Sequence, residues 1–178
     1  MKRKLIKTAM GYTALGYIIL MALVAVFGYF IIPDATSDAN SQHVEIALQK
    51  PGFECRFLEI PIASSEKVSF FEKLLGGESL TVKSKAIFSY YFRKDSLYIE
   101  TYTGLTPNSG QIEVYDCRKL QTAWEKRNGV IRVSSGIELE KFVTSNMIVK
   151  KTFLLGTDRF GRDYFSRIML GARVSITV

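Results

Sequence analysis

Residues 9–32 read AMGYTALGYIILMALVAVFGYFII, a run of 24 residues without a charge. An α-helix rises about 1.5 Å per residue, so about 20 apolar residues cross a bilayer core of roughly 30 Å. A soluble helix of this length normally has a polar face, which this run lacks. Tyrosines lie toward both ends, as at membrane interfaces, and Pro33-Asp34 ends the run. The run therefore predicts a transmembrane α-helix over 9–32.

The charges beside this helix predict its orientation. Residues 1–8 carry four cations and no acid, and Lys and Arg next to a span favour the cytoplasmic side. The N-terminus is therefore expected in the cytoplasm, and the residues from 33 onward outside it. A cleaved signal peptide is the alternative, because small residues at 35–39 offer a cleavage site. Its apolar region normally has only about 7–15 residues, which favours a retained anchor.

The net charge of +7 is confined to the two ends of the chain. Residues 1–32 carry +4, residues 33–150 are neutral with 15 bases and 15 acids, and residues 151–178 carry +3. A nucleic-acid-binding protein needs a basic stripe on its folded body, so no nucleic-acid partner is expected. One His and two Cys exclude sites that need two imidazoles or four thiolates.

Two regions follow the apolar run. Residues 33–50 are polar and mixed, and we interpret them as a connector. Residues 51–150 have the composition of a small globular domain, in which alternating and helical hydrophobic periods follow one another. The expected class is α+β with an antiparallel sheet. Strands are expected near 57–60, 80–92, 97–103, 112–117 and 130–133, and helices near 66–75, 118–128 and 137–147.

This domain offers little chemistry. The only His, His43, has no Cys or carboxylate at ligand spacing and is expected to be an exposed residue of the connector. Glu138 and Glu140 are two apart on an expected helix and so point to different faces, which argues against a general acid–base pair. The aromatic run at 90–92 indicates strand packing, with a binding stripe as the alternative. No catalytic residue, cofactor-binding residue or metal ligand is predicted.

Cys55 and Cys117 are the only thiols, and both lie on the side predicted to be extracytoplasmic, where disulfides persist. A bridge would close a loop of about 60 residues and stabilise the fold by roughly 4 kcal/mol in the chain-entropy model. The alternative is two buried free thiols, each packing as a small apolar side chain. The sequence leaves this choice open.

The stretch LGTDRFGRDYFSR at 155–167 combines cap residues with charges at helical spacing. Thr157 or Asp158 is expected to cap a helix, because its side-chain oxygen can accept the free N–H groups of the first turn. Aromatic and aliphatic residues give this helix an apolar side, so we expect it to lie at the membrane surface. Three charges spaced four apart can pair along it: Arg159, Asp163 and Arg167.

The last residues begin another apolar run. Arg173 is the last charge, and residues 174–178 predict the start of a second transmembrane helix. Five residues cannot complete a span, so we interpret the sequence as a membrane protein fragment.

The pattern L-G-T-D-x-x-G-R-D-x-x-S-R, followed by G-A-R-V-S at 171–175, resembles the signature of the second permease subunit of dipeptide/oligopeptide ABC importers. In that family the signature lies between the first and second transmembrane helices, which agrees with the basic N-terminus and single span before it. The resemblance covers residues 1–34 and 154–178. The signature residues, structural or interfacial in role, are Gly156, Thr157, Asp158, Gly161, Arg162, Asp163, Ser166, Arg167, Gly171 and Arg173.

The resemblance implies a multi-span subunit of the bacterial cytoplasmic membrane, surrounded by membrane lipid. It implies a second permease subunit, cytoplasmic ATP-binding subunits and an extracytoplasmic substrate-binding protein as partners. ATP hydrolysis would take place on the separate subunits, and neither catalysis nor a cofactor is expected in this chain, whose sequence has no Gly-rich phosphate-binding loop. The chain departs from the family in its insertion at 51–150, where the family has a short segment.

The expected function is transport, with this chain as the N-terminal part of a permease for peptides or similar small solutes. The alternative is a single-span protein that displays an extracytoplasmic binding or sensor domain. Within the signature, one hypothesis is an ion-pair network of Asp158, Arg162, Asp163 and Arg167 that seats the outer segment on the permease core. The favoured alternative is a capped interfacial helix without substrate contact. The expected regions are a cytoplasmic N-terminus (1–8), a transmembrane helix (9–32), the connector (33–50), an extracytoplasmic insertion (51–150), the signature with an interfacial helix (151–173) and the start of a second transmembrane helix (174–178).

Overall fold

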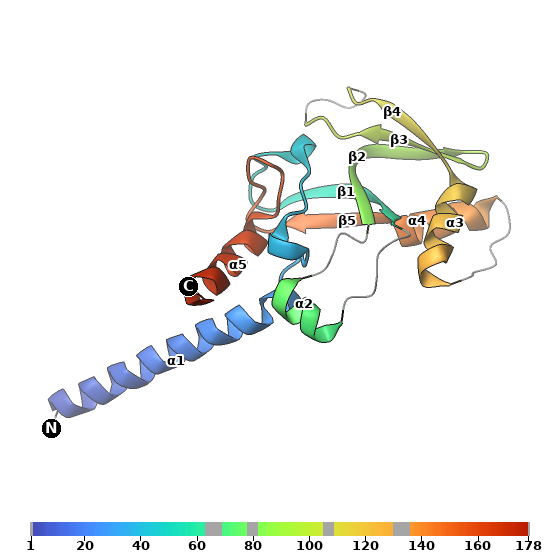
Figure 1. Cartoon of the computed structure of the whole chain (residues 1–178). Helices are drawn as coiled ribbons and strands as arrows, with labels where there is room; N and C mark the ends of the chain where they lie inside the picture. The colour runs from blue at the N-terminus through green and yellow to red at the C-terminus, as the bar shows by residue number, and fades with distance from the viewer. Residues whose placement is uncertain (1, 63–68, 78–81, 105–108, 130–135, 178) are drawn as a thin grey trace.

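A computed structural model describes residues 2–62, 69–77, 82–104, 109–129 and 136–177. A long helix projects from a domain built on one sheet, and a shorter helix leaves that domain beside it (Figure 1). The elements are α1 (Lys2–Ile31), η1 (Ser37–Ala39), η2 (Val44–Ile46), β1 (Phe53–Pro61), α2 (Phe70–Gly76), β2 (Val82–Arg93), β3 (Ser96–Thr101), β4 (Ile112–Asp116), α3 (Cys117–Asn128), α4 (Ile137–Met147), β5 (Ile148–Phe153) and α5 (Tyr164–Thr177).

The predicted helix over the apolar run is confirmed, and α1 extends it back to Lys2. Residues Thr8–Ile31 are long and apolar enough to cross a membrane. Most apolar side chains along α1 are exposed, whereas three near its C-terminal end are buried against the rest of the chain: Ala25, Tyr29 and Ile32. The helix ends at Ile31 because the residue before Pro33 is disfavoured in the helical region.

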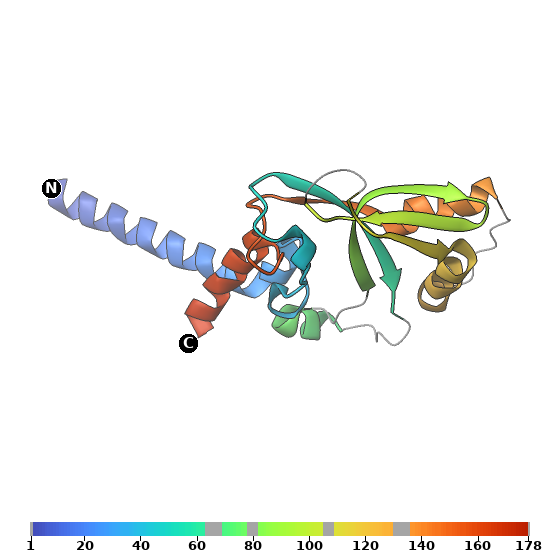
Figure 2. The same cartoon turned by 90° about the horizontal axis from the view of Figure 1, so that it is seen from above.

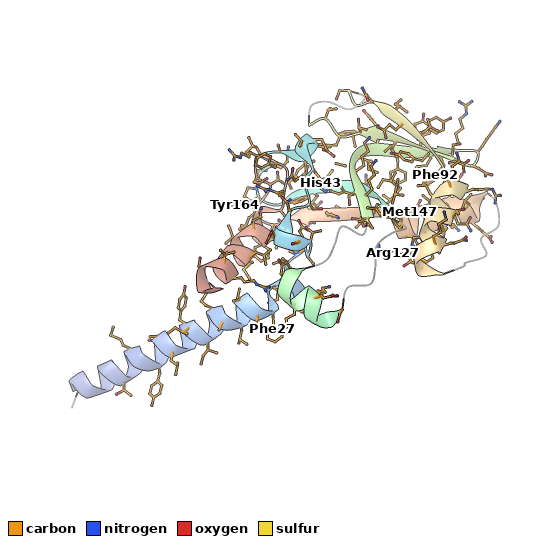
Figure 3. The ribbon with its side chains drawn as sticks, in the orientation of Figure 1. Phe27, His43, Phe92, Arg127, Met147 and Tyr164 are labelled. Carbon is orange, nitrogen blue, oxygen red and sulfur yellow. The ribbon has the colours of Figure 1, made fainter. Side chains whose placement is uncertain are left out.

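Five antiparallel strands form one sheet in the order β4-β3-β2-β1-β5. Helices α3 and α4 cover one face, and Phe92 and Met147 lie between this face and those helices (Figure 3). On the opposite face, Phe57 and Ala86 pack against Ile46 of the connector. The expected α+β class with an antiparallel sheet is confirmed. The buried cluster under α3 and α4 comprises Leu58, Ile87, Leu97, Ile99, Cys117, Leu120, Leu139, Phe142, Val143 and Met147.

Strand β2 contains the aromatic run whose role the sequence left open. Tyr90 and Phe92 pack against the cluster under α3 and α4. Tyr91 points to the other face, where it is 51% exposed and stacks on Tyr98 with ring centroids 4.9 Å apart. Alternation along the strand thus places two of the three rings in the core, which favours the packing interpretation.

Local capping accounts for the helix boundaries. Asp116 caps α3, because its Oδ1 accepts from the backbone N–H of Arg118 at 2.8 Å. Helix α4 covers the predicted residues 137–147. Helix α2 begins at Phe70, and the Ser69 N–H donates to Glu72 Oε2 at 2.8 Å. The start of the helix expected near 66–75 and the strand expected at 130–133 lie outside the described residues.

The sequence pattern does not predict strand β5. It pairs antiparallel with β1 from Leu58–Ile148 to Phe53–Phe153. Two adjacent lysines at 150 and 151 interrupt the alternation that marks a half-buried strand, and β5 follows α4 without a turn. The boundary drawn at residue 150 therefore falls inside the sheet.

Cys55 and Cys117 are both free and buried in the structure. Cys55 packs with Phe57, whereas Cys117 packs with Leu58 in the cluster under α3 and α4, on the opposite face of the sheet. The disulfide that the sequence allowed is not formed, and the alternative of two buried thiols describes the structure. Burial raises the pKa of each thiol to about 11, so the reactive thiolate is scarce at neutral pH.

We predict that the folded protein reacts slowly with Ellman's reagent at pH 8, because both sulfur atoms are buried and protonated. Denaturing the unreduced protein should expose two thiols that react at once. The measurement is thiol titration with and without guanidinium. A denatured, unreduced sample without free thiols would contradict this arrangement and indicate a bridge.

Candidate functional site

The signature residues form a loop before the helix. Residues 154–163, called the signature loop below, run beside the connector, and α5 begins only at Tyr164 (Figure 1). An isolated bridge between Thr157 and Asp163 closes the loop. The prediction that Thr157 or Asp158 caps a helix is therefore wrong. Asp and Thr favour turns as strongly as helix starts, so the sequence pattern suited both structures.

The connector is folded against the signature loop. It forms two short 3₁₀ turns, η1 and η2, in which Ala39 and Ile46 are fully buried. His43, expected to be exposed, is only 8% exposed, and its ring centroid lies 4.8 Å from that of Phe57 (Figure 3). This burial lowers the pKa of His43. The expectation was wrong because a residue 118 positions later, Gly161, covers the backbone of His43.

Two signature glycines allow this close packing. Gly156 and Gly161 have φ angles of 75° and 71°, a region that side chains with a Cβ rarely adopt. A Cβ on Gly156 would overlap the carbonyl oxygen of Gln49, and a Cβ on Gly161 would overlap that of His43. Glycine is therefore required at both positions for two independent reasons, conformation and space.

Thr157 joins the signature loop to the connector. Its hydroxyl donates to the carbonyl oxygen of Ile46 and accepts from the Gln49 N–H at 2.9 Å. The Thr157 N–H donates to the Gln49 carbonyl at 3.1 Å. Two further backbone bonds continue this contact, Leu48 N–H to Asp158 O at 3.0 Å and His43 N–H to Phe160 O at 3.1 Å.

The Asp158 carboxylate organises the turn that follows it. Its Oδ1 accepts from the backbone N–H of Phe160 at 2.8 Å and of Arg162 at 3.0 Å. Its Oδ2 lies 2.7 Å from the Arg162 guanidinium and 3.7 Å from that of Arg167. Burial by itself would raise the pKa of Asp158, but the hydrogen bonds from Arg162 and Phe160 outweigh burial and lower this pKa. Three of the four expected members of the ion-pair network are thus together.

Asp163 has a different role from the one expected. The structure places it at the start of α5, where its Oδ2 accepts from the Ser166 N–H at 3.2 Å and from the Ser166 hydroxyl. The expected pairs with Arg159 and Arg167 are not formed among the described residues. The Ser166 hydroxyl in turn accepts from the Asp34 N–H at 3.1 Å. Asp163 therefore connects the start of α5 to the residues just beyond α1.

Helix α5 packs on the C-terminal end of α1. Leu170 of α5 lies in one buried cluster with Tyr29 and Ile32. The Arg173 guanidinium lies 5.1 Å from the centroid of the Tyr29 ring and donates to the Leu74 carbonyl at 2.8 Å. Arg173 thus links α5 to both α1 and α2. The structure does not explain why residue 171 is a glycine, because a Cβ there would meet open space.

The sequence analysis missed the contribution of the connector. Asp34 Oδ1 accepts from the Thr36 hydroxyl at 2.6 Å, and its Oδ2 accepts from the Ser41 N–H at 3.1 Å. Asn40 Oδ1 accepts from Arg162 at 3.1 Å. An Asp two residues before Thr is typical of an Asx turn, which could have revealed the turn at Asp34. No signal in the sequence identifies Arg162 as the partner of Asn40.

The hydrogen bonds described above hold the connector against the signature loop, and a pocket lies beside them. Thr157 and three backbone hydrogen bonds join the signature loop to the connector, whereas Asp158 and Asp163 bond within the loop and to Ser166 of α5. Across the described part of the chain, no three His, Cys, Asp or Glu side chains are grouped to hold a metal ion. A pocket of about 420 Å³ lies where the connector, β2, β5 and Asp163 meet.

Comparisons of the chain with protein-family models, with curated proteins and with solved structures found no match.

We predict that Gly161→Ala destabilises the folded domain by at least about 2 kcal/mol. A left-handed backbone costs an Ala about 1–2 kcal/mol, and the added Cβ would also clash with the carbonyl of His43. The matched control is Gly171→Ala, which has open space and removes a helical glycine, so it should be neutral or stabilise by up to about 1 kcal/mol. Thermal unfolding in detergent measures both, and equal stabilities would contradict the close packing.

We predict that Asp158→Asn destabilises the fold by about 1.5–3 kcal/mol at pH 7, the usual range for hydrogen bonds to a charged group. Because the folded-state pKa lies below the ordinary value of 3.8, the carboxylate stabilises the fold above that pH and loses its effect as pH falls through the folded pKa. The difference between wild type and variant should therefore disappear in strong acid.

The control for Asp158→Asn is Asp95→Asn. Asp95 forms a longer, exposed ion pair with Arg118 at 3.6 Å, so its loss should cost at most about 1 kcal/mol. Urea unfolding at several pH values compares the two variants. A larger effect of Asp95→Asn, or a difference for Asp158→Asn that persists below the folded pKa, would contradict the assigned role.

Proposed function

We propose that this chain is the N-terminal part of a transmembrane permease subunit of an ATP-driven importer for peptides or similar small solutes. One observation carries the proposal: the signature loop ties the outer end of α1 to the start of α5. As a result, the free ends of both helices lie on the same side of the sheet domain in both views (Figures 1 and 2). Two helices that enter one membrane surface need this arrangement.

The membrane placement follows from the two helices. Exposed apolar side chains cover α1 up to Ile31, and its N-terminal flank is basic, which favours a cytoplasmic N-terminus. The sheet domain would then lie outside the cytoplasm, in a bacterial cytoplasmic membrane. Helix α5 points toward that membrane and would continue as the second transmembrane helix, since Val174 near its end is 58% exposed.

In such an importer the chemical steps take place on other subunits, which agrees with the structural role of the polar residues in this chain. Its polar network is used for internal hydrogen bonds, as described for Thr157 and Asp158. The chemical work would be done by cytoplasmic ATP-binding subunits, and a second permease subunit would complete the pathway. An extracytoplasmic substrate-binding protein would dock on the outer side, where the sheet domain lies.

A second candidate function is a single-span protein that displays an extracytoplasmic binding or sensor domain. The observation that favours it is the five-stranded sheet with two buried clusters and a pocket of about 420 Å³. A domain with its own core and a pocket can bind a ligand without any transport pathway. The two candidates differ in what is bound to the chain in its membrane.

The test is purification of the native polypeptide from its own membrane in mild detergent, followed by mass spectrometry and an ATPase assay. We expect a polypeptide with further apolar spans, two kinds of partner subunit and hydrolysis of MgATP. Arg162→Ala should lower the amount of assembled complex because it breaks the pair with Asp158. Lys126→Ala, on the exposed surface of α3, is the matched control and should leave assembly unchanged. A single-span polypeptide without an ATP-binding partner would contradict transport and support the second candidate.

A further inference from the structure

The pocket beside the signature loop has walls from three parts of the chain. The connector contributes residues from Pro33 to His43, strand β2 contributes Val82 and Ser84, and strand β5 contributes Lys150 to Phe153. Asp163 completes the lining from the start of α5. The pocket thus lies beside the outer end of α1, within the part of the fold that the signature loop holds rigid.

One carboxylate oxygen of a residue that lines this pocket has no partner among the described residues. Asp163 is only 5% exposed, and its Oδ2 is bonded to Ser166. Its Oδ1 is buried and accepts no hydrogen bond from any described residue. A buried carboxylate oxygen without a donor is costly, because it has lost water and gained nothing in return. A ligand that donates a hydrogen bond to this oxygen would remove that cost.

The charges around the pocket favour a cation. Asp34 and Asp163 form no ion pair with any described residue. The two lining lysines are already neutralised, since Lys150 Nζ lies 2.6 Å from Glu54 and Lys151 Nζ lies 2.6 Å from Glu59. Burial lowers the pKa of His43, so its ring is neutral at pH 7. Two aspartates that form no ion pair with a described residue therefore line the pocket.

The remaining walls fit an organic cation better than a metal ion. Four apolar residues line the pocket, and they can contact an alkyl chain: Pro33, Ala35, Val82 and Phe153. A metal ion would need several ligands at one point, and no group of three such side chains occurs within the described ranges. A primary ammonium group supplies both a positive charge and three N–H donors.

We propose that this pocket binds an organic cation with a primary ammonium group, which pairs with the carboxylates of Asp163 and Asp34. Because α1 ends two residues before the pocket begins at Pro33, the ammonium group has two possible sources. It belongs either to a small soluble amine or to the headgroup of phosphatidylethanolamine in the outer leaflet. This inference does not depend on the transport function, since either candidate function can use the site.

The test uses the full chain in nanodiscs of phosphatidylcholine, whose headgroup has no primary ammonium. Radiolabelled putrescine is titrated by equilibrium dialysis, and we expect saturable binding of one molecule per chain. Asp163→Asn should weaken binding by about tenfold or more, the effect of losing a hydrogen bond to a charged group. The Asn side chain still accepts from Ser166 through its oxygen, so α5 keeps its cap. Absence of saturable binding, or equal binding by Asp163→Asn, would overturn the proposal.

A second variant fills the pocket without touching the signature loop. Ser84→Trp should abolish putrescine binding, because Ser84 lines the pocket on β2. Its matched control is Lys83→Trp on the adjacent, exposed position of the same strand, which points away from the pocket and should bind as wild type does. Thermal unfolding confirms that each variant is folded before binding is compared. Unchanged binding by folded Ser84→Trp would show that the amine binds elsewhere and overturn the proposal.

Repeating the titration in nanodiscs with phosphatidylethanolamine distinguishes the two sources. If the headgroup is the ligand, putrescine binding should weaken by about tenfold or more in competition with the lipid. If the ligand is a soluble amine, binding should be the same in both lipids. Competition by tetramethylammonium as strong as that by putrescine would overturn the proposal, because this cation has no N–H donor.

Discussion

The backbones of the connector and the signature loop pack against each other. The distance between these two backbones determines how the C-terminal end of α1 is placed relative to the N-terminal end of α5. Gly156 and Gly161 make this separation possible, since a side chain at either position would overlap a connector carbonyl. Thr157 then joins the two segments through hydrogen bonds to Ile46 and Gln49, more than 100 positions earlier in the chain. Without this contact, α1 and α5 would lose their common base and His43 would return to water.

Three aspartates around this contact have the same charge and different surroundings. Asp158 is surrounded by donors, two backbone N–H groups and the Arg162 guanidinium, and this lowers its pKa. Asp34 accepts from Thr36 and Ser41 and has no ion pair among the described residues. Asp163 uses one oxygen for Ser166 and leaves the other without a donor. Asp158 is thus compensated by an ion pair with Arg162, whereas Asp34 and Asp163 have only neutral donors among the described residues.

Local signals predicted the elements whose causes are local. The apolar run predicted α1, the alternation of apolar and polar residues predicted β2, and the helical period predicted α4 with its boundaries. Most of the failures involve a partner distant in sequence, whereas the bond between Asp163 and Ser166 is local. Strand β5 is specified by pairing with β1 rather than by its own alternation. His43 is buried by Gly161, and Asp163 bonds to Ser166 and through it to Asp34. The signature residues were identified from their pattern, but their pairing required the fold.

The topology of the sheet explains how a domain of this size can lie between two helices that start side by side. The chain enters the sheet at Phe53 and leaves it at Phe153, and these residues face each other on the paired strands β1 and β5. Their rings stack with centroids 6.1 Å apart, and the Gly52 N–H donates to the Phe153 carbonyl at 2.9 Å. The domain therefore closes on itself, and α1 and α5 are positioned by the connector, the signature loop and contacts with α2. A permease with a short segment at this place could acquire such a domain without a change in the spacing of its first two helices.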